Sequence, residues 1–263
     1  MRRLRWGLFK EQVIVQLMVR TLNFWSLSLL ILQPFTFSVV GMLLSRAAGR
    51  PMPDLVYNVI GGGMMGMWSG IVFTSSWDIR GDRHTGVLEL IVGSPTSLFL
   101  LNAIRSFTNV LSGFFSMALS FLAAILIFKF PVSQANIPGT LVSLLLLLFS
   151  TWSISMFLSV FFAWSRISGH FVEYLEMPVA IICGFMYPIR VLPGWMQSIS
   201  TGIPIRWSLE AMNESLLGLS DAAFLFNHWG SAVLLALAYL GITFLLQKKV
   251  HDLIRINGEL SAI

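Results

Sequence analysis

The sequence predicts an all-helical integral membrane protein that forms a single domain over residues 1–263. Hydrophobic residues make up 56% of the chain and charged residues only 11%. The apolar residues gather in runs close to the roughly 20 residues that a helix needs to cross a bilayer. Basic residues interrupt residues 1–20, so no cleavable signal sequence is expected there.

Six apolar runs are expected to cross the membrane, which places both termini on the same side. The runs cover residues 23–44, 59–77, 106–128, 141–164, 169–187 and 229–246. With cytoplasmic termini, twelve of the 17 Lys and Arg residues lie inside and five lie outside. Because positive charge favours the inner side, we expect a multi-pass protein of the cytoplasmic (inner) membrane with both termini in the cytoplasm.

Residues 1–20 combine basic side chains with apolar ones such as Trp6, Phe9 and Leu17. This mixture is typical of a helix that lies in the plane of the lipid headgroups. A basic tail without helical structure is the alternative interpretation.

The fifth run is too short to cross alone, because Glu173 and Glu176 enter it and only residues 177–189 are free of charge. The shortened run favours an ordinary position at the membrane interface for both glutamates. Residues 192–218 are too apolar for a free loop and are broken by proline and glycine. We therefore predict a re-entrant hairpin of two short helices there.

A charged segment, Asp78–Pro95, separates the second and third runs. Gly86 permits a sharp change of chain direction, Val87 and Leu88 belong to a short apolar face, and Pro95 ends the segment. The pattern indicates a docking element for a cytoplasmic partner. A solvated loop that follows the positive-inside rule is the alternative.

Small and polar residues recur at helical spacing in the second and third runs. Gly62, Gly66 and Gly70 expose backbone along one face, which favours close helix packing, either between subunits or within one subunit. One polar face of the third run fits two interpretations: a transport pathway, or helix packing through hydroxyl groups. That face consists of Asn109, Ser112, Ser116 and Ser120.

Glu210 and Glu214 lie one helical turn apart in the predicted re-entrant segment. They are candidates for an outer gate, with Arg190 or Arg206 as candidate partners. A position facing the headgroups is the alternative.

Two separated patterns resemble one known family. The first is Asp82-Arg83-His84-Thr85-Gly86-Val87-Leu88-Glu89 followed by Ser94-Pro95. The second is Gly184, Pro188, Leu192-Pro193-Gly194-Trp195, Pro204, Glu210 and Leu216-Leu217-Gly218. These two patterns, their order, the six apolar runs and the length together make the chain similar to the permease subunits of type-2 ABC exporters. The resemblance covers essentially the whole chain. Asp82 replaces the commoner Glu, Val87 replaces Thr, and Ile205-Arg206-Trp207 departs from the usual apolar-aromatic sequence.

The resemblance implies a half-transporter that pairs with a second permease subunit, either another copy or a related chain. Two separate ABC ATPase subunits would bind ATP and Mg and drive export of an amphipathic drug-like, lipid-like or glycan-linked substrate. The sequence contains no G-x-x-x-x-G-K-[ST] phosphate loop, so no nucleotide site and no cofactor are expected in this chain. The resemblance places contact with the ATPase on Asp82, Arg83, Gly86, Val87, Leu88, Glu89 and Pro95.

Two rival functions remain open: a secondary transporter without an ATPase, and a membrane scaffold that anchors a cytoplasmic partner. The four histidines are scattered and Cys183 is the single cysteine, so neither a metal site nor catalytic chemistry is expected. The net charge of +5 follows from membrane orientation, and nucleic acid is not an expected partner.

Overall fold

The computed structural model describes residues 24–47, 49, 52–84, 98–128, 136–165, 169–218 and 221–257. Helices joined by short turns make up these ranges, and no strand occurs within them. The helices are α2 (Phe24–Ala47), α3 (Met52–His84), α5 (Leu98–Phe128), α6 (Ile137–Ser165), α7 (Gly169–Ile182), η1 (Ile189–Val191), α8 (Gly194–Ser200), α9 (Pro204–Leu217) and α10 (Ala222–Asn257). The predicted all-helical class is confirmed for this part of the chain.

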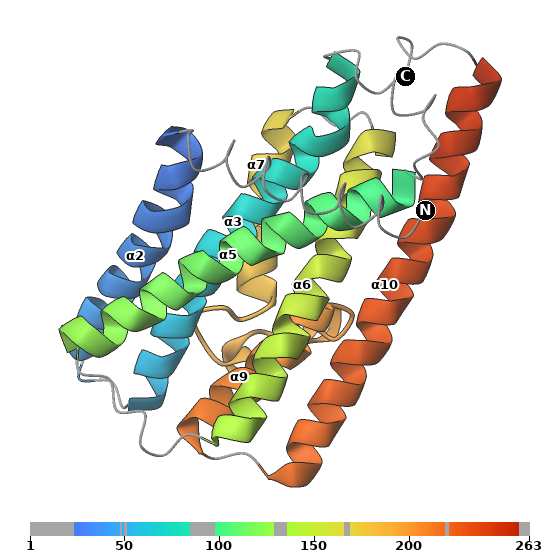
Figure 1. Cartoon of the computed structure of the whole chain (residues 1–263). Coiled ribbons are helices and arrows are strands. Elements are labelled where there is room, and N and C mark those ends of the chain that lie inside the picture. Colours follow the sequence, from blue (N-terminus) through green and yellow to red (C-terminus); the bar gives the residue numbers. More distant parts are fainter. Residues whose placement is uncertain are drawn as a thin grey trace, which may run out of the picture.

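Helix α3 is the centre of the bundle. It contacts α2, α5, α6, α7 and α9, and it supplies many of the buried core side chains, including Met64, Met67 and Trp68. Figure 1 shows α5 crossing diagonally in front of α3, with α7 behind and α10 at the edge next to α6. Most of the other helices therefore pack against α3.

In the part of the chain that the structure describes, four helices are long and apolar enough to cross a membrane. Their apolar stretches are Leu55–Ser75, Leu98–Leu122, Ile137–Phe162 and Ala222–Lys249. They coincide with four of the six predicted crossings, although each helix extends beyond the predicted bounds. Among the described residues, the other two predicted crossings correspond to a shorter apolar stretch in α2, Ile31–Ser45, and to the 14 residues of α7.

Helix α7 ends at Ile182, before the predicted end of the fifth crossing at residue 187. Gly184 adopts a left-handed φ of 64°, and a Cβ there would lie 2.8 Å from both the Ile189 side chain and the Tyr187 carbonyl oxygen. A side chain at this position is therefore disfavoured by both conformation and space. At 1.5 Å per residue, α7 reaches only about 21 Å, which is less than a bilayer core.

Two short helices, α8 and α9, follow this break within the segment 192–218. Pro204 occupies the first turn of α9, where its missing N–H costs no helical hydrogen bond. Gly218 ends the helix with a φ of 67°, and its N–H bonds back to the Glu214 and Ser215 carbonyls. The chain thus contains two short helices where the sequence predicts them.

Helix α6 has a well-defined start next to α9. The Asn136 side-chain oxygen accepts a hydrogen bond from the Gly139 N–H at 3.1 Å, as an N-cap residue does. The Asn136 N–H donates to the Ser215 carbonyl of α9 at 2.9 Å. This end of the bundle lies opposite the end where α3 finishes at His84 (Figure 1).

Candidate functional site

A charged cluster joins α9 to α10 at the α9 end of the bundle. The Glu210 carboxylate oxygen Oε2 lies 3.7 Å from Arg206 Nε and 3.5 Å from His228 Nε2. The Arg206 guanidinium stacks 4.5 Å from the centre of the Trp207 ring, and Trp207 meets His228 edge to face. We call Arg206, Trp207, Glu210 and His228 the α9–α10 cluster.

His228 lies between two oxygen atoms. Its Nδ1 is 2.9 Å from the Phe224 carbonyl oxygen, and its Nε2 is 3.5 Å from Glu210 Oε2. Of the two candidate partners of Glu210, Arg206 is the one that forms an ion pair with it among the described residues.

Glu214 faces α3 instead of α10. Its Oε1 lies 3.5 Å from the hydroxyl of Tyr57, which is itself buried near the start of the apolar stretch of α3. The two glutamates predicted as an outer gate therefore belong to different contacts: Glu210 links α9 to α10, and Glu214 links α9 to α3.

A second polar site lies inside the bundle and connects α2, α3 and α7. Glu176 Oε1 accepts hydrogen bonds from the Ser69 hydroxyl and from the Gln33 side-chain amide, the latter at 2.9 Å. The Trp68 indole N–H donates to the Glu176 carbonyl oxygen at 3.1 Å. Glu176 is only 9% exposed and is therefore buried within the protein, while its position at the membrane interface stays a prediction.

The donors to Glu176 are neutral. No ion pair of Glu176 occurs among the described residues, and Ser69 belongs to the apolar stretch of α3. An ionisable side chain in such surroundings is costly, and in membrane proteins it commonly marks a functional site. Sequence reasoning missed Gln33 and Ser69; a lone Gln in the apolar run of α2 was the available signal.

The polar face of α5 lies inside the protein. Asn109, Ser112, Ser116 and Ser120 are each at most 5% exposed. Ser112 donates back to the Thr108 carbonyl at 2.9 Å, whereas the Ser116 and Ser120 hydroxyls have no hydrogen-bond partner among the described residues. Within one chain this face serves helix packing, and its part in a pathway stays a prediction.

Two of the three predicted packing glycines lie against α2 of the same chain. A Cβ on Gly62 would meet the Ser38 backbone nitrogen at 2.6 Å, and one on Gly66 would meet the Pro34 ring at 2.7 Å. A Cβ on Gly70 would have no atom within 4 Å. Close approach thus occurs at Gly62 and Gly66, and its partner is intramolecular.

The predicted docking segment is described only in its first part. The α3 backbone stays helical through Asp82 and Arg83 to His84, beyond the apolar stretch that ends at Ser75. The rest of the segment, residues 85–95, lies outside the described residues, as do residues 1–20; it includes Gly86, Val87, Leu88, Glu89 and Pro95.

No model of a known protein family matches this chain, and no curated protein matches it either. The resemblance to type-2 ABC permeases therefore rests on the sequence alone: the two patterns, their order, the six predicted runs and the length. What the described residues establish is a helical bundle with four helices suited to a membrane and two polar sites within it.

Proposed function

We propose that the chain is the membrane-spanning permease subunit of an ATP-driven exporter of the type-2 ABC class. In this proposal it crosses the inner membrane six times, keeps both termini in the cytoplasm and carries α8 and α9 as a re-entrant hairpin. A second permease subunit completes the pathway, and two ABC ATPase subunits bind ATP and Mg. The substrate is an amphipathic drug-like, lipid-like or glycan-linked molecule. The Asp82–Pro95 and Gly184–Gly218 patterns support the family.

One structural observation carries the proposal furthest: α3 is both the central helix and the helix that leads into the docking segment. It contacts α2, α5, α6, α7 and α9, and it runs without a break to His84. A partner that pushed on the segment after His84 would therefore move the helix on which most others pack. Helix α9, which carries Arg206 and Glu210, lies at the end opposite His84 (Figure 1), and in this proposal that end faces the outside.

The test is recovery of an ATPase with the full chain. The protein would be tagged at its carboxyl terminus and purified in gentle detergent from its own cells, next to a double variant, Arg83→Glu with Glu89→Lys. A matched control, Lys248→Glu, reverses an exposed charge on the same predicted side but outside the segment. We expect an ATPase with a phosphate loop to copurify with the native chain and with the control only. Failure to recover any ATPase with the native chain would overturn the proposal.

A secondary transporter is the second candidate, and Glu176 is the observation that favours it. A buried carboxylate held by Ser69 and Gln33 resembles the proton-relay residues of carriers that need no ATPase. The purified chain alone, in vesicles loaded with ethidium, would distinguish the two functions. Movement of ethidium driven by a proton gradient and abolished by Glu176→Gln would favour the carrier; no movement without an ATPase would favour the exporter.

A further inference from the structure

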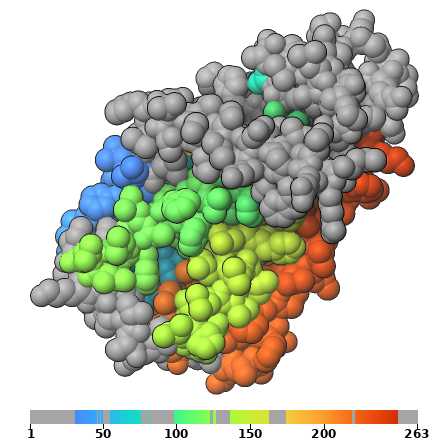
Figure 2. Space-filling model, in the orientation of Figure 1, coloured from blue at the N-terminus to red at the C-terminus, as the bar shows by residue number. Residues whose placement is uncertain are grey.

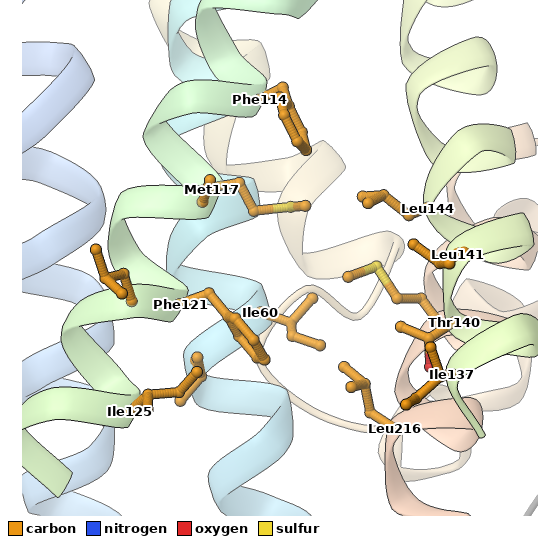
Figure 3. A pocket seen from close by; sticks show the side chains of 14 residues that line it. Ile60, Phe114, Met117, Phe121, Ile125, Ile137, Thr140, Leu141, Leu144 and Leu216 are labelled. Atoms are coloured by element: carbon orange, nitrogen blue, oxygen red, sulfur yellow. The ribbon is translucent and has the colours of Figure 1, made fainter. Parts of the chain in front are cut away.

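A cavity of about 500 Å³ lies between α5 and α6, apart from both polar sites. Figure 3 shows its walls: Met117 and Phe121 project from α5, Leu144 from α6, Ile60 from α3 and Leu216 from α9. The cavity is therefore built by four helices, and its volume falls in the range of ordinary ligand pockets.

The lining accepts hydrocarbon and little else. Thr140 is the only polar residue of the 14 that line the cavity, and its hydroxyl already donates to the Asn136 carbonyl at 2.9 Å. No charged side chain is among the 14. A charged or hydrogen-bonding ligand would lose its own partners on entry, because the lining side chains offer none in return. Met117 and Met212 are flexible enough to adapt to chains of different shape.

The cavity opens toward the surface between α5 and α6. Figure 2 shows α3 and α9 through the gap between these two helices. The rim is apolar: Leu122 on α5 and Leu141 on α6 are each more than half exposed. Both helices are apolar enough to cross a membrane, so the opening faces lipid when the protein is in a bilayer.

The lining favours a single hydrocarbon chain over a protein segment. A short protein segment would bring backbone N–H and C=O groups at its ends, for which the lining side chains offer no partner. An extended acyl chain has no such groups and is thin enough to follow a lining shared by four helices. We propose that this cavity is a binding site for the acyl chain of a membrane phospholipid, which enters sideways between α5 and α6. The proposal depends only on the protein lying in a bilayer and is independent of the export function.

The test uses the purified full chain in lipid nanodiscs that contain phosphatidylcholine with a diazirine at the end of one acyl chain. After irradiation, labelled peptides are mapped by mass spectrometry. Leu144→Trp fills the cavity, and Leu234→Trp makes the same exchange on the exposed face of α10. We expect adducts on the cavity residues of α5 and α6, their loss in Leu144→Trp, and no change in Leu234→Trp.

A second filling variant, Ile137→Trp, places the new ring at the exposed mouth of the cavity and keeps the test valid if Leu144→Trp does not fold. Three results would overturn the proposal. The first is labelling that is equal on α10 and insensitive to both filling variants, which would indicate ordinary contact with surrounding lipid. The other two come from a photoreactive residue in place of Leu141: it could crosslink to a second copy of the chain, or to residues 1–23 of the same chain. Either crosslink would show that a protein segment, and not a lipid, occupies the cavity.

Discussion

Helices α3 and α10 are both long enough to cross a membrane, yet they differ sharply in burial. Inside the protein, 94% of the apolar stretch of α3 is buried, compared with 17% of that of α10. The more hydrophobic helix of the two is α10. In a water-soluble protein the order would be reversed, because burial there follows hydrophobicity.

The difference shows what drives packing in this chain. Hydrocarbon lipid is as apolar as leucine, so leucines on α10 gain little from facing another helix. Helix α3 instead carries glycines that admit neighbours and polar groups that bind them. Gly61, for example, lies so close to Phe185 that a Cβ would come within 2.2 Å of its carbonyl oxygen. Close backbone contact and buried hydrogen bonds, more than hydrophobicity, identify the central helix.

The largest expected effect comes from filling a glycine contact. In Gly62→Leu the new side chain must displace the Ser38 backbone on α2, which we expect to destabilise the protein by about 3 kcal/mol or to prevent folding. The matched control is Gly241→Leu on α10, where a Cβ has no atom within 4 Å. Thermal unfolding in detergent would compare the two. Equal loss of stability in both variants would contradict the contrast between the helices.

Removal of the buried carboxylate should have the next largest effect. Glu176→Ala removes the acceptor shared by the Ser69 hydroxyl and the Gln33 amide, which leaves them the Met65 carbonyl and the Ser69 hydroxyl oxygen, respectively, at an expected cost of about 1–3 kcal/mol. Glu176→Gln keeps an acceptor oxygen and should recover much of that loss. Leu245→Ala, on the exposed face of α10, is the control and should change little. Unfolding temperatures that are the same for the Ala and Gln variants would show that the hydrogen bonds do not matter.

Two tryptophans give a finer comparison. Trp68 on α3 donates to the Glu176 carbonyl at 3.1 Å and is fully buried, whereas Trp229 on α10 donates to the Ser143 hydroxyl at 2.9 Å and is half-buried. Trp229→Phe loses one hydrogen bond between membrane helices, worth about 0.6 kcal/mol. Trp68→Phe should cost more, because it also leaves a gap in the core. Thermal unfolding in detergent would compare the two variants, and a larger loss of stability for Trp229→Phe than for Trp68→Phe would contradict the proposed ranking.

The sequence was sufficient for the helical class and insufficient for helix partners. Long apolar runs predict helices whatever their neighbours, and these predictions hold for α3, α5, α6 and α10. The spacing of Gly62 and Gly66 predicts close approach, but only the fold shows that α2 approaches them.

The burial of Glu176 is a second feature that the sequence alone does not predict. Its position near the start of a short run predicts the interface, whereas its burial is decided by Gln33 on α2 and Ser69 on α3, which are distant in sequence. The polar faces raise a similar difficulty. Serines at helical spacing on α5 look the same in sequence whether they line a pathway or pack inside a bundle.

The most direct test of the proposed function places a photoreactive amino acid at one of two positions in the full chain, in living cells. One is Leu88, in the predicted docking segment; the other is Leu245, on the exposed face of α10. After irradiation, adducts would be identified by mass spectrometry. We expect an adduct with a nucleotide-binding ABC subunit from position 88 and none from position 245. A folded, membrane-inserted chain that gives no ATPase adduct from position 88, or an equal one from position 245, would contradict the assignment as an ABC permease.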